Sequence, residues 1–384
     1  MIPLGQVAEF EMGQAPRGTE CNTKGIGTVF VKAGEFNDPY PIEREWTTKP
    51  LKHGRKGDVF ICVVGATAGK LNLGIDCAIG RSVAAIRPSQ SLNTHFLYYQ
   101  LQPWVLKLRY ASAGSAQGVI SKRQLAEIPI ELPSVDEQRR IVAELEKQFS
   151  RLDEAVANLK RVIMRLAGYR KRALDDAFAP EPSATLGELI SEGPQNGLYL
   201  PKDAYGSGTP IVRIDDYQTD WMRPVAELRR VRATDSQVSM WALEPGDVLV
   251  NRVNSMSHLG KCAVVPNALA GALFESNMMR FRLVPEVLPR YVELYLASSL
   301  GKRRLTANAK WAVNQASINQ KDVLATEIPL PSLVRQASIV EEVDRRLSIV
   351  REVEAEVDAN LKRAQALRQA VLARAFAAPG ESGQ

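Results

Sequence analysis

The feature that most constrains this fold is an internal repeat of the sequence. The segment "LPSVDEQRRIVAELEKQFSRL" from Leu132 reappears as "LPSLVRQASIVEEVDRRLSIV" from Leu330, an offset of 198 positions. The offset holds without a gap to the end of both segments, where Ala177–Ala179 and Ala375–Ala377 both read "AFA". A repeat at this period indicates two copies of one structural plan in tandem.

Each copy predicts one long helix. A Pro-Ser pair precedes each segment at Pro133 and Pro331, and apart from Gly168 no Gly or Pro follows until Pro180 and Pro379. A helix of about 42 residues would be about 63 Å long at 1.5 Å per residue. Two such helices side by side would act as a spacer.

An apolar residue recurs in alternating steps of four and three along each helix, which is typical of a coiled-coil seam. Glu354 interrupts the second stripe, and both stripes continue to an arginine at the same point, Arg170 and Arg368. We therefore predict an antiparallel coiled coil, with packing of each helix onto its own globular domain as the alternative. The expected seam residues are Leu145, Phe149, Leu152, Val156, Leu159, Ile163 and Leu166, then Val343, Leu347, Val350, Val357, Leu361 and Ala364.

The regions before the helices are related more loosely. "GTVFVKAGEF" from Gly27 corresponds to "GTPIVRIDDY" from Gly208, and "GDVFI" from Gly57 to "GDVLV" from Gly246. Short runs of Val, Ile and Phe broken by Gly and Asp predict strands and turns, with one helix per domain over 95–110 and 290–305. The fold class is α+β: two mixed α/β domains, 1–131 and 181–329, spacer helices over 132–180 and 330–378, and a flexible tail, 379–384.

Composition indicates a protein that touches a polyanion over part of its surface. The net charge is +6, and all of the excess lies in residues 1–180. No apolar run approaches the roughly 18 residues of a membrane span, so we expect a cytoplasmic location. Four cysteines without a C-x-x-C pair and three scattered histidines predict neither zinc nor disulfides.

Two short motifs imitate catalytic sites. "VGATAGK", Val64–Lys70, is one residue too short for a phosphate-binding loop, and Leu71 stands where a hydroxyl is needed. Its counterpart in the second half keeps only Gly260 and Lys261, so we expect a tight turn that exposes one positive charge per domain. "NDPY", Asn37–Tyr40, is similar to an amino-methyltransferase motif but favours a turn. A nucleotide hydrolase using Lys70 stays a remote alternative, and the chain does not look catalytic.

The joint between domain and helix carries a family resemblance. "GSAQGVISKRQLAEIPIELPSVDEQRRIV", Gly114–Val142, and its copy Ala312–Val340 resemble the consensus of specificity subunits of type I restriction-modification systems. In the copy, Ala312 and Val313 replace Gly114 and Ser115, so that turn need not serve the same purpose twice.

The resemblance implies two target-recognition domains, each reading one half of a bipartite, asymmetric target in double-stranded DNA, with the helices holding them apart. It also implies docking of two DNA-methyltransferase (modification) subunits and of motor-nuclease (restriction) subunits. S-adenosylmethionine, ATP and magnesium would bind to those partners and not to this non-catalytic chain. A coiled-coil adaptor that binds proteins without reading DNA is the alternative.

Candidate DNA contacts follow from basic clusters on expected loops, where solvated charge is the competing interpretation. Gln117 and Gln315 occupy equivalent places beside the joint and are expected to support it. Tyr217, Trp221 and Trp311 are possible base-facing aromatics, but core positions are favoured. The group at 302–304 also suits a helix C-terminus. The candidates are Lys49, Lys52, Arg55, Lys56 and Lys70, then Arg229, Arg230, Arg232, Arg252, Lys261, Lys302, Arg303 and Arg304.

Overall fold

The computed structural model describes residues 1–113, 119–178, 181–219, 221–255, 257–312 and 315–376. The chain forms two compact units. Unit 1 combines Met1–Lys160 with Asp358–Gln384, and unit 2 is Arg161–Val357. Unit 1 therefore contains segments from both ends of the sequence. The expected tail, 379–384, and Gln117 lie outside the described residues.

Unit 1 is built on two sheets and a strand pair. The first sheet has the order β2-β10-β7-β8, with antiparallel pairing throughout. The second has the order β3-β5-β4-β9-β6, in which β4 and β9 are parallel. The strands are β1 (Ile2–Pro3), β2 (Ala8–Met12), β3 (Cys21–Asn22), β4 (Thr28–Val31), β5 (Trp46–Thr47), β6 (His53–Gly54), β7 (Val59–Cys62), β8 (Leu71–Leu73), β9 (Cys77–Ile79), β10 (Val83–Pro88) and β11 (Pro129–Ile130), which pairs with β1.

Unit 2 repeats this plan. Its main sheet, β13-β22-β18-β20, is again antiparallel, and its second sheet, β17-β14-β21, again contains one parallel pair. The loose correspondence seen in the sequence is thus a shared topology. The strands are β12 (Ser183–Thr185), β13 (Ile190–Asn196), β14 (Tyr205–Val212), β15 (Tyr217–Gln218), β16 (Trp221–Met222), β17 (Arg229–Val231), β18 (Val248–Asn251), β19 (Val253–Asn254), β20 (Cys262–Val264), β21 (Leu273–Phe274), β22 (Met278–Leu283), β23 (Lys310–Ala312), β24 (Gln315–Ser317) and β25 (Glu327–Pro329).

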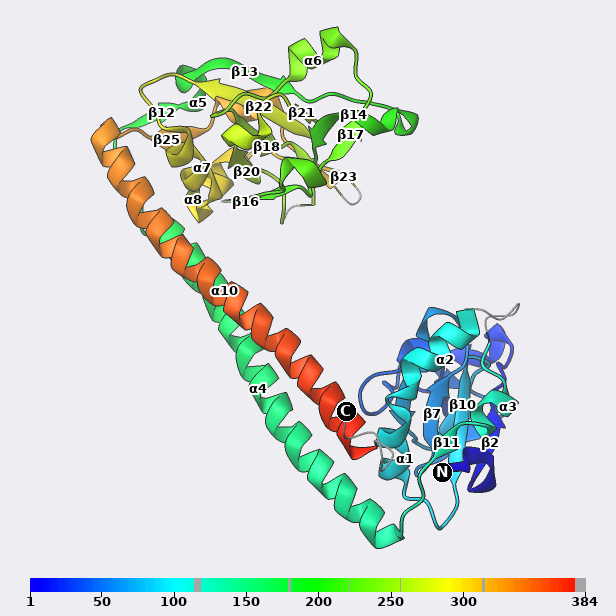
Figure 1. The fold of residues 1–384 in the computed structure, drawn as a ribbon. Coiled ribbons are helices and arrows are strands. Elements are labelled where there is room, and N and C mark those ends of the chain that lie inside the picture. Colours follow the sequence, from blue (N-terminus) through cyan, green and yellow to red (C-terminus); the bar gives the residue numbers. More distant parts are fainter. Residues whose placement is uncertain (114–118, 179–180, 220, 256, 313–314, 377–384) are drawn as a thin grey trace. The chain divides into compact units, whose positions relative to one another are not determined.

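The expectation of one helix per domain at 95–110 and 290–305 is wrong, because each segment forms two. In unit 1, α1 (Thr94–Leu101) and α2 (Trp104–Ala113) flank Pro103, which has no backbone N–H to donate to the preceding turn of a helix. In unit 2, α7 (Pro289–Ala297) is followed by Ser298, whose hydroxyl accepts from Gly301 N at 3.1 Å and caps the start of α8 (Ser299–Leu305). Figure 1 shows α7 and α8 beside β18 and β20. Four shorter helices are α3 (Lys122–Ala126), α5 (Leu186–Leu189), α6 (Asp235–Trp241) and α9 (Gln320–Leu324).

The two longest helices are α4 (Val135–Asp175) and α10 (Leu333–Ala375). In unit 1, Leu145 and Phe149 of α4 pack against Leu372 of α10. In unit 2, Leu174 of α4 lies in one core with Leu347 of α10. Residue numbers rise along one helix as they fall along the other, so the helices pair antiparallel, as predicted (Figure 1).

The expected seam residues differ in exposure. Leu152, Val156, Leu159, Leu166 and Leu361 are half-buried, and Val343, Leu347, Val350, Val357 and Ala364 are buried with Leu145 and Phe149. Ile163 is 36% exposed, whereas the neighbouring Val162 is half-buried. The apolar stripe of α4 has therefore moved by one residue at this point, as it does when a straight helix drifts against a seven-residue repeat.

Within the described ranges, no helix is long and apolar enough to cross a bilayer. The same residues contain no group of three or more His, Cys, Asp and Glu side chains placed to hold a metal ion. All four cysteines are free thiols. Burial raises the pKa of the Cys62 and Cys77 thiols to about 12.

Candidate nucleic-acid interface

In unit 1, a buried glutamine joins the globular domain to its long helix. Gln138 lies in the first turn of α4 and is completely buried. Its carbonyl accepts from Asn93 N at 2.7 Å, and its amide donates to Ser91 O at 2.9 Å and Pro133 O at 2.8 Å. Asn93 is the N-cap of α1, so one side chain fixes the start of α4 to the start of α1.

Gln336 makes the same joint in unit 2. Its carbonyl accepts from Leu288 N at 2.9 Å, and its amide donates to Glu286 O at 3.2 Å and Pro331 O at 2.9 Å. Leu288 is the N-cap of α7. We call these two glutamines, Gln138 and Gln336, the joint glutamines. They are the glutamines of the repeated motif, and their role was missed in the sequence because their partners lie up to 50 positions away.

The far end of each long helix is also fixed, through the repeated "AFA" phenylalanine. Phe178, just beyond α4, packs edge-on against Tyr291 and Tyr295 of α7 in unit 2. Phe376, just beyond α10, packs edge-on against Phe96 of α1 in unit 1. Each long helix therefore starts in one unit and ends packed in the other.

In both Gly-Lys turns the lysine donates to a backbone carbonyl of its own domain. Lys70 Nζ donates to Phe36 O at 2.7 Å. Lys261 Nζ donates to Ile214 O at 2.7 Å and Tyr217 O at 2.6 Å, and lies 4.6 Å from the centre of the Tyr217 ring. Desolvation lowers the pKa of Lys261. The expectation that this turn exposes its lysine holds for Lys70, which is exposed, and is wrong for Lys261, which is half-buried because two loop carbonyls need a donor.

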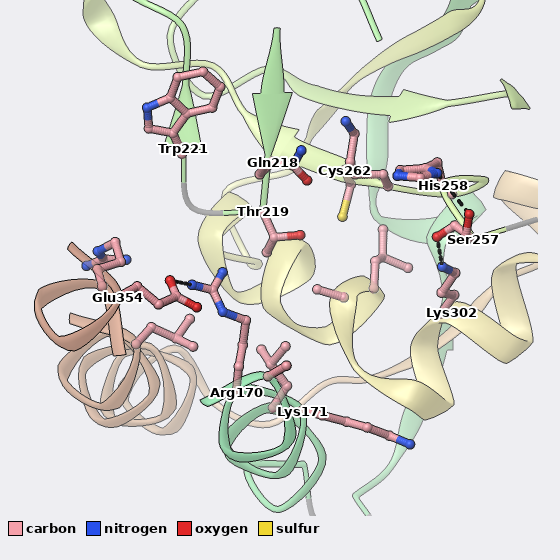
Figure 2. A pocket seen from close by; sticks show the side chains of 18 residues that line it. Arg170, Lys171, Gln218, Thr219, Trp221, Ser257, His258, Cys262, Lys302 and Glu354 are labelled. Carbon is pink, nitrogen blue, oxygen red and sulfur yellow. Dashed lines mark hydrogen bonds and ion pairs between the residues drawn. The ribbon is translucent and has the colours of Figure 1, made fainter. Parts of the chain in front are cut away.

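A hollow of about 760 Å³ lies beside this turn in unit 2 (Figure 2). Gln218, Thr219 and Trp221 of the β15–β16 hairpin form one wall, and Arg170 and Glu354 of the long helices lie opposite. The hollow is rich in cations and exposes an amide and an indole, a combination suited to a nucleic-acid backbone and bases. Its further cationic lining residues are Lys171, Lys261, Lys302 and Arg351.

Two of the four clustered cations predicted in unit 1 are engaged. Lys49 Nζ lies 3.4 Å from Glu20, and Lys52 Nζ lies 2.6 Å from Glu11. Arg55 and Lys56 are exposed, and their side chains have no partner among the described residues. Lys56 lines a second hollow, of about 640 Å³, together with Tyr40. Arg55 and Lys56 are thus the members of the cluster available to a phosphate.

The predicted cations of unit 2 fall into two groups. Arg229 and Arg303 are exposed and have no side-chain partner among the described residues. The others donate within the domain: Arg230 to Gly208 O at 3.0 Å, Arg232 to Asp203 O, Arg252 to Ser276 O at 3.1 Å, Lys302 to Ser257 O at 2.6 Å, and Arg304 to Tyr295 Oη at 3.0 Å. Burial also lowers the pKa of Lys302. DNA contact by any of these residues stays a prediction.

The aromatic candidates also differ in exposure. Tyr217 is fully buried, whereas Trp311 on β23 is 72% exposed and Trp221 is 46% exposed. Gln315 on β24 is exposed. The two tryptophans thus offer stacking surfaces that the favoured core interpretation did not provide.

The comparisons with known proteins agree with this construction. A family model described as "Type I restriction modification DNA specificity domain" matches residues 1–163. The chain is 25% identical over 366 residues to the EcoKI specificity subunit of Escherichia coli K12, covering 91% of this chain and 77% of the relative. The StySPI specificity subunit of Salmonella potsdam matches with the same identity and coverage. The first part of the chain thus matches the type I specificity domain, and the chain as a whole is similar to type I specificity subunits.

Solved structures of type I specificity subunits and systems share the fold. A chain from a structure of a type I R-M system, described for complex assembly and conformational transition, matches with a TM-score of 0.74 at 20% identity, covering 98% of this chain and 96% of that one. The HsdS subunit from Thermoanaerobacter tengcongensis matches with a TM-score of 0.52 at 22% identity, covering 98% and 95%. The role of a specificity subunit is to provide DNA sequence specificity, and this role is non-catalytic.

Proposed function

We propose that this chain recognises a bipartite, asymmetric DNA target, with each unit reading one half. The observation that carries the proposal is the duplicated recognition domain, whose first copy matches a DNA specificity domain. Similar but unequal domains present different side chains to the two half-sites, so the target is not palindromic. The base pairs between the half-sites are spanned and not read.

We further propose that two DNA-methyltransferase subunits and the motor-nuclease subunits assemble on this chain in the cytoplasm. S-adenosylmethionine, ATP and magnesium then bind to those partners. The support is the family: the relatives are specificity subunits of restriction enzymes, and this chain supplies no motif for the chemistry. The long helices offer exposed apolar side chains for docking, among them Met164, Tyr169, Val353 and Leu367.

The test is binding of the assembled complex to DNA over a range of salt concentrations, followed by mapping of methylated bases. Phosphate contacts release counterions, so affinity falls steeply as salt rises. Methylation should mark one two-part sequence. A flat salt response, or methylation without sequence preference, would refute DNA readout and favour a protein-binding adaptor.

A further inference from the structure

The two recognition domains share an anchor that leads into an exposed loop. In unit 1, Glu35 accepts from Lys32 N at 3.0 Å and closes a turn at the end of β4. In unit 2, Asp216 accepts from Arg213 N at 3.0 Å at the end of β14. Both acids are buried, and they occupy the same place in the repeat.

The next residue in each domain is a buried aromatic whose backbone carbonyl accepts a hydrogen bond from a lysine. Phe36 follows Glu35, and Tyr217 follows Asp216. The Gly-Lys turn supplies the lysine that binds the carbonyl of this aromatic, Lys70 to Phe36 O at 2.7 Å and Lys261 to Tyr217 O at 2.6 Å. The acid, the aromatic and the lysine recur together, so both domains contain the same three-residue anchor.

An exposed amide follows the anchor in both domains. Asn37 comes directly after Phe36, and Gln218 directly after Tyr217. Neither side-chain amide has a partner among the described residues, although the backbone of Asn37 is held by Asn72. Gln218 also lines the cation-rich hollow of unit 2 (Figure 2).

Beyond the amide, the two loops differ. In unit 1, Asp38 accepts from Tyr98 Oη at 2.7 Å, and Pro39 O accepts from Leu73 N at 2.7 Å, so the chain runs along β8. In unit 2, Gln218 pairs with Trp221 in the β15–β16 hairpin. The anchor and the amide are therefore shared by the two domains, whereas the loop beyond them is specific to each.

We propose that Asn37 and Gln218 are base-reading residues, and that Lys70 and Lys261 are positioning residues that hold them at the DNA. A carboxamide offers a donor and an acceptor together, and this pair matches the N6 and N7 edge of adenine in the major groove. The inference rests on the proposed function and adds to it the residues that set one position in each half-site.

The first test is Gln218→Ala in the complex with the modification subunits, with methylated bases mapped in random-sequence DNA. Discrimination at one position of one half-site falls roughly 5- to 150-fold, the range of one bidentate contact. The other half-site is unchanged. Asn37→Ala lowers discrimination at one position of the other half-site and leaves the first half-site unchanged. Asn267→Ala and Gln90→Ala, exposed amides outside these loops, are the matched controls and leave the target intact.

The second test separates positioning from stability. Lys261→Met removes both donations while keeping the length of the side chain, and it should relax the same half-site as Gln218→Ala. Lys261→Arg, which restores donors, should recover part of the discrimination. A merely structural lysine would lower the melting temperature and leave the methylated sequence as it was.

The outcomes distinguish this inference from the proposed function. If the unaltered complex methylates without sequence preference, DNA readout itself fails. If it methylates one two-part sequence and neither amide substitution changes any base preference, the base-reading assignment is overturned while readout stands. A change in both half-sites from either single substitution also overturns it, because each amide belongs to one unit.

Discussion

At the residue scale, the joint glutamines show what a sequence motif conceals. Gln138 and Gln336 stand inside the motif that carried the family resemblance, and each satisfies three backbone groups from two different elements. Periodicity identified the helices on which they lie. Their partners in the domains could not be predicted, since contacts 45 to 50 positions apart leave no trace in local patterning.

Gln138→Leu should destabilise unit 1, because it leaves Asn93 N, Ser91 O and Pro133 O without their partner. An unsatisfied buried polar group costs about 1–3 kcal/mol, so we expect a loss of about 3 kcal/mol for the site. Urea denaturation measures it. Gln148→Leu, on an exposed face of α4, is the control and should stay within about 0.5 kcal/mol of the original protein. Equal effects from both substitutions would refute the joint.

The lysines of the two Gly-Lys turns show a different limit of sequence reasoning. The sequence located both Gly-Lys turns correctly, but it predicted that the charge faces solvent. Lys70 is indeed exposed, whereas Lys261 is half-buried, since carbonyls of the preceding loop converge on it from Ile214 and Tyr217. Arg55 and Lys56 lie in an equally basic stretch and do stay exposed, so charge alone does not tell the two situations apart.

At the element scale, the interruption of the second seam by Glu354 has a partner. Arg170 of α4 lies 3.0 Å from Glu354 of α10 in unit 2. In unit 1 the equivalent arginine, Arg368 of α10, lies 2.8 Å from Asp153 of α4 and 4.4 Å from the centre of the Phe149 ring. Polar residues in an apolar seam specify register at a cost in stability, so these arginines fix how the helices align.

Glu354→Leu should destabilise the helix pair by about 1–2 kcal/mol, since Arg170 then loses this carboxylate in a half-buried site. The double substitution Arg170→Leu with Glu354→Leu should recover the loss and exceed the original stability, because the seam becomes continuously apolar. Thermal unfolding measures both. Arg345→Ala, which breaks an exposed pair with Glu342, is the control. A double variant less stable than the single one would contradict this account.

The long helices also carry a prediction about spacing. Seven residues inserted in each helix preserve the heptad phase and add about 10 Å, or about three base pairs of roughly 3.4 Å. The unread gap should lengthen by that amount while both half-sites keep their sequence, as seen by methylation mapping. Inserting four residues in place of seven changes the phase and serves as the control. Altered half-sites with an unchanged gap would exclude a ruler.

At the scale of the whole molecule, the repeat predicted the plan, and packing refines how its parts can be exchanged. Replacing residues 1–131 with another recognition domain should change one half-site only. The replacement must bring its own contacts for the helices: in this chain Tyr99 packs on Phe149, and Phe96 on Phe376. Methylation mapping of the hybrid tests this. Simultaneous change of both half-sites would mean that the units do not read independently.

The composition of unit 1 has a consequence for the order of synthesis. Leu145 and Phe149 leave the ribosome well before the residue that covers them, Leu372, which follows Phe149 by 223 positions. At roughly 5–20 residues per second, this apolar face waits on the order of tens of seconds for its partner. During that time the apolar side chains of Leu145 and Phe149 stay exposed on the nascent chain. Expression conditions that slow translation should therefore increase aggregation of this protein more than of a chain whose domains close in sequence order.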